Sequence, residues 1–202
     1  MDSRSKEELA REAFRRAGGI LRTRDALAAG IHPRTLYAMR NAGQLETLTR
    51  GVYRLADMPP LADPDLATVA ARVPAGVVCL ISALSFHDLT TQIPHEVFLA
   101  LPRGARPPVL NHPPLQILWF NRGVFEAGIE RHKGDGVEIK VYSPEKTVAD
   151  CFKFRDRVGL DVAVEGLRRL RERAPLKIQA LNRFARIDGV ERVMRPYVEA
   201  LL

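Results

Sequence analysis

The feature that most constrains this chain is the spacing of small and apolar residues between Ala26 and Met39. A helix-turn-helix needs a small residue where its two helices cross, a glycine in the turn, and apolar residues on the inner face of the second helix. Here Ala26 stands four residues before Gly30, and Ile31, Leu36 and Met39 stand one, six and nine residues after it. The spacing therefore predicts two short helices joined by a turn at Gly30.

The segments around this motif predict its boundaries. A helix is expected over residues 5–17, where apolar residues recur at helical spacing before two glycines. Thr23 is the expected N-cap of the first motif helix. Pro33 suits the first turn of the second helix, which we expect to reach Ala42 before Gly43 ends it.

Two extended segments follow, over residues 45–48 and 52–55, and they flank the turn Thr49-Arg50-Gly51. A helix-turn-helix followed by such a hairpin is a winged helix-turn-helix, and its second helix reads the major groove of double-stranded DNA. We therefore predict a DNA-binding domain over residues 1–57.

Arginine pairs bidentately with guanine and asparagine with adenine, so outward residues of the second helix are the expected readers of sequence. Arginines at the wing and before the first motif helix are better placed for phosphates. Two alternatives stay open, namely that Arg40 is only a solvated charge and that Tyr37 belongs to the core. The predicted DNA contacts are Arg22, Arg24, Arg34, Thr35, Tyr37, Arg40, Asn41 and Arg50.

The distribution of charge favours a nucleic-acid partner for this domain. The whole chain carries a net charge of +7. Residues 1–55 hold eleven basic and six acidic side chains, residues 56–154 nine and eleven, and residues 155–202 eleven and seven. A basic surface raises the local concentration of polyanions. The excess of basic residues in residues 1–55, called the head below, argues against a winged helix that serves only as a protein–protein module.

The rest of the chain predicts an α+β domain over residues 63–202. A proline-containing linker precedes it, and Asp63 and Pro64 open a helix. One strand, a short helix and three further strands then precede a helical C-terminal tail. The expected strands are 77–81, 96–101, 115–120 and 137–142, and the expected helices are 64–73, 82–89, 145–154, 160–173, 176–185 and 190–201.

No pattern in the sequence indicates catalysis, a metal site or a cofactor. The five histidines lack metal-ligand spacing, and Cys79 and Cys151 lie far apart in apolar surroundings. The E-x-K of Val137–Lys140 also occurs in nucleases, but alternation on a half-buried strand explains it equally. No apolar run is long enough to cross a bilayer, and the charged N-terminus is unlike a signal peptide. We therefore expect a cytoplasmic protein that is not an enzyme.

The arrangement resembles the AbiEi-type antitoxins of type IV toxin–antitoxin systems. The resemblance is carried by Gly18–Leu55, by Val77–Pro108 with its segment VVCLISALSFHDL, and by Val137–Leu170 with VEIKVYSPEKTVADCFKF. It implies an N-terminal winged helix that represses the operon, binding inverted repeats, and a C-terminal domain that opposes a nucleotidyltransferase-like toxin. A repressor whose C-terminal domain senses a small ligand is the alternative, because the expected strands could enclose a pocket.

The tail carries a second basic cluster. Its residues could contact DNA flanking the operator, or a toxin or the RNA on which that toxin acts. A solvated amphipathic helix with Leu160, Val164, Leu167 and Leu170 inward explains the same pattern. The predicted second basic surface consists of Arg168, Arg169, Arg171 and Lys177.

Overall fold

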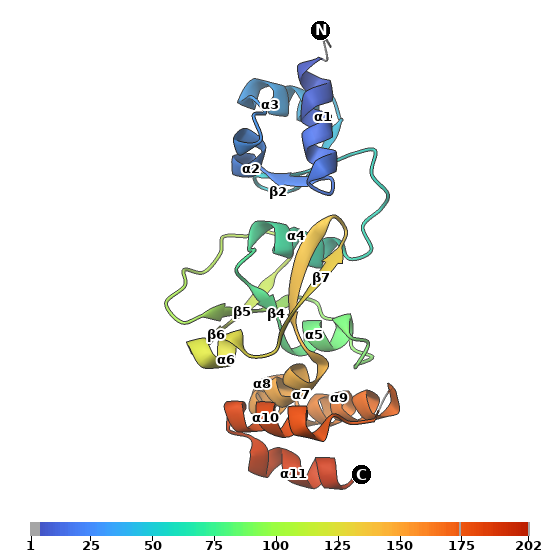
Figure 1. The fold of residues 1–202 in the computed structure, drawn as a ribbon, viewed down its shortest axis with the longest axis vertical. Helices are drawn as coiled ribbons and strands as arrows, with labels where there is room; N and C mark the ends of the chain where they lie inside the picture. Colours follow the sequence, from blue (N-terminus) through green and yellow to red (C-terminus); the bar gives the residue numbers. More distant parts are fainter. Residues whose placement is uncertain (1–4, 174, 202) are drawn as a thin grey trace. The chain divides into compact units, whose positions relative to one another are not determined.

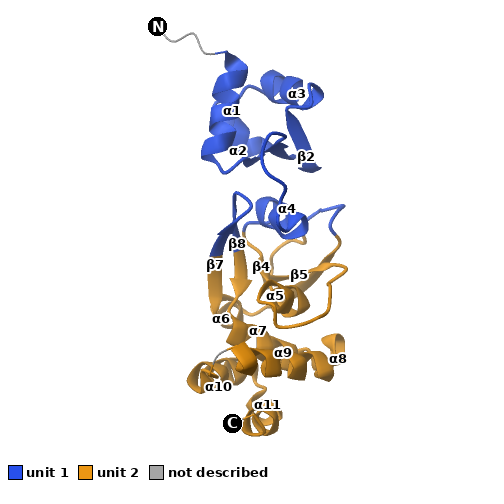
Figure 2. Cartoon of the chain, turned by 90° about the vertical axis from the view of Figure 1, so that its right-hand side faces the viewer, with its two compact units in different colours: residues 1–74, 108–113, 132–139 blue, residues 75–107, 114–131, 140–202 orange. Residues whose placement is uncertain are grey.

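The computed structural model describes residues 5–173 and 175–201 and divides the chain into two compact units (Figures 1 and 2). Unit 1 comprises the chain up to Pro74 together with residues 108–113 and 132–139. Unit 2 comprises residues 75–107, 114–131 and 140–202. Each unit is described below by itself.

Unit 1 begins with a winged helix-turn-helix, in which three helices and a sheet with the order β1-β3-β2 surround an apolar core (Figure 1). A fourth helix, opened by Asp63 as N-cap and Pro64 in the first turn, follows the sheet. The elements are α1 (Lys6–Arg16), β1 (Ile20–Arg22), α2 (Thr23–Ala28), α3 (Pro33–Asn41), β2 (Leu45–Thr49), β3 (Val52–Leu55) and α4 (Pro64–Arg72).

The motif residues of the sequence form the core of this unit. Ala26, Leu36 and Met39 are fully buried, and Phe14 of α1 packs among them. α1 starts at a capping box in which the Ser5 hydroxyl accepts from the backbone N–H of Glu8 and the Glu8 carboxylate accepts from that of Ser5. The predicted helix-turn-helix is therefore present.

In unit 1, the prediction of one N-cap was wrong and one strand was missed. The N-cap of α2 is Arg22 rather than Thr23, and Arg22 caps without a side-chain hydrogen bond. Thr23 is instead the first helical residue, and its side chain points to the wing turn, as described below. The sequence also failed to predict β1, which adds a third strand to the wing by pairing with β3.

Unit 2 is built on a mixed five-stranded sheet with the order β6-β5-β4-β8-β7, although residues 132–139 of β7, β8 and their turn are assigned to unit 1. β5 runs parallel to β6 and antiparallel to β4, which in turn runs parallel to β8. The strands are β4 (Val77–Val78), β5 (Val97–Pro102), β6 (Leu115–Phe120), β7 (Ile129–Gly134) and β8 (Val137–Tyr142).

The helices of unit 2 cover the sheet and form the C-terminal tail, where α7, α9, α10 and α11 gather (Figure 2). α7 lies at the centre, and every residue from Glu145 to Phe152 in it is buried. The helices are α5 (Leu80–Phe86), α6 (Arg122–Glu126), α7 (Pro144–Lys153), α8 (Arg155–Val158), α9 (Leu160–Arg173), α10 (Ile178–Asp188) and α11 (Glu191–Glu199).

The α+β fold class with a helical tail is thus confirmed, with differences in detail. The predicted strand over 77–81 stops at Val78, because the chain enters α5 at Leu80. β7, α6 and α8 were not predicted. Leu160, expected to point inward, is exposed, whereas Leu167 is fully buried.

The turn between β7 and β8 has positive φ at both central residues, Asp135 (52°) and Gly136 (75°). Two positive φ angles define the type I′ hairpin turn, which matches the twist of the strands. The Asp135 carboxylate also accepts the backbone N–H groups of Ala62 and Asp63, at 2.8 and 2.9 Å. The turn therefore fixes the start of α4 within unit 1.

Candidate nucleic-acid interface

α3 presents the side chains expected to read DNA. Leu36 and Met39 point into the core with no exposed surface, which turns Arg34, Tyr37 and Asn41 outward. Tyr37 keeps 41% of its surface exposed and is therefore not a core residue. Thr35 is only partly exposed, so it lies at the edge of this face rather than at its centre.

Three of the α3 residues that are predicted to contact DNA also contact one another. The Arg40 guanidinium lies 5.2 Å from the centre of the Tyr37 ring, and it donates two hydrogen bonds, at 3.2 and 2.9 Å, to the side-chain oxygen of Asn41. Bidentate pairing of asparagine with adenine needs that same oxygen as an acceptor. Asn41 can therefore read adenine only after Arg40 moves away, for example to a phosphate.

The wing turn is joined to the start of α2. The Thr23 N–H donates to the Gly51 carbonyl at 2.9 Å, and the Thr23 hydroxyl donates to the same oxygen at 3.4 Å. β1 adds the pairing of Arg22 with Val52. The structure thus brings Arg50 to the same end of unit 1 as Arg22 and Arg24, although their segments are separated in the sequence.

The three arginines at this end differ in their ion pairs and in how much of each side chain is exposed. The Arg22 Nε lies 2.5 Å from one carboxylate oxygen of Asp25, and the Arg24 Nε lies 3.2 Å from the other. Partial burial opposes ionisation of Asp25, but the hydrogen bonds from Arg22 and Arg24 outweigh it and lower the pKa of Asp25. Arg24 remains 76% exposed, whereas Arg22 keeps only 21%, so Arg24 and Arg50 are the better phosphate contacts.

Internal ion pairs account for other basic residues of the head. Arg11 and Arg15 both contact the Asp57 carboxylate, at 3.1 and 3.0 Å. Arg54 is buried, pairs with Glu46 at 3.1 Å, and donates to the Pro59 carbonyl. These arginines join α1 and the sheet to other parts of unit 1, so they are less available for direct contacts with phosphates.

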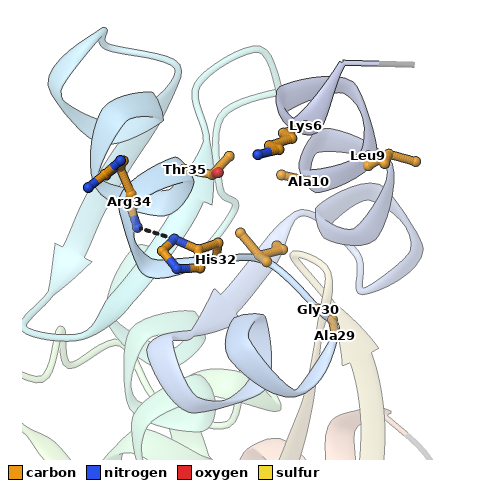
Figure 3. A pocket seen from close by; sticks show the side chains of 9 residues that line it. Lys6, Leu9, Ala10, Ala29, Gly30, His32, Arg34 and Thr35 are labelled. Atoms are coloured by element: carbon orange, nitrogen blue, oxygen red, sulfur yellow. Dashed lines mark hydrogen bonds between the residues drawn. The ribbon is translucent and has the colours of Figure 1, made fainter. Parts of the chain in front are cut away.

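Sequence reasoning missed two further polar residues beside α3. His32 is the N-cap of α3, and its Nδ1 accepts the backbone N–H of Arg34 at 3.2 Å. Lys6, in the first turn of α1, lines the same hollow as His32, with a volume of about 490 Å³ (Figure 3). The signal that could have indicated His32 is its position directly before Pro33, where an N-cap is expected.

The predicted second basic surface is only partly free. Arg168 and Arg171 are exposed on α9. Arg169 pairs with Glu165 at 2.8 Å, and Lys177 lies 3.3 Å from the buried Glu145 carboxylate. The four residues therefore do not act alike, and Arg168 with Arg171 is the pair best able to meet an anion.

Unit 2 also contains a buried ion network that the sequence did not predict. The Lys146 Nζ lies 2.5 Å from Asp150 Oδ1 and 3.1 Å from Asp188 Oδ2, and all three side chains are fully buried. The Phe120 and Tyr142 rings stand 5.4 and 4.9 Å from this ammonium group. The network ties α7 to the end of α10.

Asp150 is the member of the network whose charge is least well compensated. Burial raises the pKa of Asp150 to about 7, although the adjacent Lys146 lowers it. Its Oδ2 is buried without a hydrogen-bond partner among the described residues. Because burial disfavours the ionised form, this carboxyl group stabilises the fold less as it becomes more fully ionised.

The two cysteines are not activated for nucleophilic chemistry. Cys79 and Cys151 are free and buried, as expected, and burial raises the pKa of both thiols, which keeps them protonated. Within residues 5–173 and 175–201, no three His, Cys, Asp or Glu side chains gather where a metal ion could bind. None of the helices in the described part of the chain is long and apolar enough to cross a membrane.

The winged helix-turn-helix with an exposed polar face on α3 defines the class of DNA-binding transcriptional regulators. Residues 8–56 match the model of a family described as transcriptional regulator, AbiEi antitoxin. The match confirms the resemblance to AbiEi-type antitoxins, and it lies in the part of the chain that holds α1, the helix-turn-helix and the wing. This region is therefore similar to the DNA-binding part of regulators of the antitoxin type.

The fold as a whole also has a counterpart. The chain is similar to the crystal structure of the RV2827C protein from Mycobacterium tuberculosis, with 16% sequence identity and a TM-score of 0.54. The similarity covers 99% of this chain and 80% of that chain. At this identity it shows the fold alone. A comparison with curated proteins gives no match.

Proposed function

We propose that the protein is a cytoplasmic transcriptional autorepressor that binds operator DNA at inverted repeats, and that its C-terminal domain, over residues 63–202, counteracts a nucleotidyltransferase-like toxin. The observation that carries the DNA-binding half is the outward face of α3 beside the wing, where Arg34, Asn41 and Arg50 are exposed. In this proposal, Arg34 pairs with a guanine and Arg50 with a phosphate. Domain boundaries at residues 57 and 63 are part of the proposal.

A gel shift on the DNA upstream of the gene tests this half. Arg34→Ala should cost about 1–3 kcal/mol and relax the preference for one base pair. Arg50→Ala should weaken binding to all sequences alike and lower the salt slope by about 1. Arg72→Ala, an exposed arginine at the end of α4, is the control and should bind as the wild type does.

Indifference of both the Arg34 and Arg50 variants would refute the assignment of α3 and the wing. Binding that is lost with both variants, but equally on unrelated DNA, would show a nonspecific DNA-binding protein and would contradict the repressor. The control distinguishes either outcome from a general effect of removing charge.

The antitoxin half is supported by the family match and by the separate core of unit 2. If a neighbouring gene encodes a nucleotidyltransferase, co-expression with that enzyme tests the antitoxin role by growth. We expect the wild type and the Arg34→Ala variant to restore growth equally, because α3 belongs to the DNA-binding half. Failure of the wild type to protect cells would refute the antitoxin role and leave the repressor role intact.

A ligand-sensing C-terminal unit receives no comparable support. The hollow of about 460 Å³ beside α9 is bordered by the exposed Leu160 and Asp161 rather than enclosed. Small-molecule sites usually bury most of their ligand.

A further inference from the structure

A hollow of about 490 Å³ lies between α1 and the start of α3, and its polar lining is positively charged or hydrogen-bond donating. Lys6 comes from α1, His32 precedes α3, and Arg34 and Thr35 come from its first turn. Figure 3 shows the Lys6 amine directed across the hollow toward the Thr35 hydroxyl, with the His32 ring below them. Leu9 and Ile31 contribute apolar walls, and the lining includes no acidic residue.

We propose that this hollow binds one backbone phosphate of the operator DNA through Lys6, His32 and Thr35. The proposal rests on the proposed DNA-binding function and adds a contact that positions α3 along the groove. Thr35 then holds the phosphate, whereas the sequence had predicted it to meet base edges.

The chemistry of His32 supports this role. Because its Nδ1 accepts the Arg34 N–H, the neutral ring carries its proton on Nε2. The hydrogen bond also fixes the orientation of the ring, so Nε2–H is a donor held in place before DNA arrives. Phosphate oxygens accept from such groups, and half or more of protein–DNA hydrogen bonds go to phosphate and sugar.

The surroundings of Lys6 support it as well. The two glutamates that follow Lys6 have other partners: Glu8 accepts the Ser5 N–H at 2.6 Å, and Glu7 accepts from Gln44 at 3.3 Å. None of the ion pairs found among residues 5–173 and 175–201 includes Lys6. Its charge is therefore available to an anion in the hollow.

Salt-dependent binding to operator DNA tests the proposal. A lysine that neutralises one phosphate contributes about 0.9 to the slope of log affinity against log salt. Lys6→Met should lower the slope by this amount and weaken binding about tenfold at low salt, as expected for a charge-assisted hydrogen bond. Lys133→Met, an exposed lysine of β7, is the matched control and should leave the slope unchanged.

The substitution His32→Asn distinguishes the proposed phosphate contact of His32 from its role as the N-cap of α3. Asparagine is a good N-cap, so α3 should keep its stability, which circular dichroism on heating checks. The variant loses the Nε2–H donor, and binding should fall about fivefold with the base preference unchanged. Because a neutral donor releases no counterion, the slope should stay that of the wild type.

The outcomes that overturn the proposal differ from those that overturn DNA binding itself. If Arg34→Ala impairs binding but Lys6→Met leaves the slope unchanged, DNA binding stands and the phosphate site is refuted. A change of base preference in His32→Asn would make His32 a base reader instead. Saturable binding of inorganic phosphate alone, lost in Lys6→Met, would assign the hollow to a free anion and overturn the DNA assignment.

Discussion

Replacing Lys146 by methionine is the sharpest test of how unit 2 is held together. Methionine keeps most of the buried stem of the lysine but removes the ammonium group, and thereby leaves two fully buried carboxylates, Asp150 and Asp188, without their shared partner. Lys153 still reaches Asp188 at 3.4 Å, so Asp150 loses most. We expect a large loss of stability from a nearly isosteric change.

The size of the loss follows from the chemistry of a broken buried ion pair. Removing one partner costs about 3–5 kcal/mol, because an uncompensated charge stays in the interior. Protonation limits the cost, since a carboxyl group with an ordinary pKa near 4 can be neutralised at pH 7 for about 4 kcal/mol. A small domain is stable by about 5–15 kcal/mol, so the variant should lose roughly a fifth or more of the total.

Urea unfolding followed by tryptophan fluorescence measures this loss of stability in unit 2, because Trp119, the single tryptophan, lies in β6. The midpoint should fall with little change in slope. The loss should shrink toward pH 5, where the stranded carboxyls protonate more readily. Lys153→Met is the control, because that side chain is 29% exposed and should cost about 1 kcal/mol or less. Equal, small losses in both variants would refute the reasoning.

Two further predictions concern α7. The raised pKa of Asp150, about 7 against 3.8 in the unfolded chain, means that its contribution is fully present below about pH 4 and is lost as the pH rises through 7. Asp150→Asn should therefore flatten the fall in unit 2 stability between pH 5 and 8, as measured by urea unfolding at each pH, and an unchanged profile would contradict the assignment. Ser143→Ala should lower the unfolding free energy by about 1 kcal/mol, because the hydroxyl caps α7 by accepting the Lys146 N–H at 3.3 Å. Thermal unfolding checks this cap, and a midpoint equal to that of the wild type would show that it adds nothing.

Local patterns predicted the helix-turn-helix well, because its information lies in neighbouring residues. The glycine turn and the buried positions of α3 recur at fixed spacing, so the predicted end of α3 differs from the observed one by a single residue. The predicted strand over 77–81 was too long, because the apolar run that indicated a strand does not show where the strand ends. A short apolar run fits a buried strand or a buried helix, and only the turn into α5 at Leu80 separates them.

Long-range pairs account for what the sequence could not predict. Asp188 reaches Lys146 from α10, and His32 meets Lys6 across the hollow, although no local spacing relates either pair. β7 was missed because charged residues alternate with only partly buried ones along it, which gives no apolar run.

The charge of a segment is a weaker guide to function than the partners of its basic side chains. In the head, Arg54, Arg11 and Arg15 are engaged in internal ion pairs, so the potential that DNA meets comes from a few outward groups such as Arg34 and Arg50. The tail resembles the head in composition and also in this respect. There, salt bridges engage Arg169 and Lys177 and leave Arg168 and Arg171 outward. An even spread of charge would suit nonspecific attraction, whereas a few fixed groups beside a positioned helix suit the reading of one sequence.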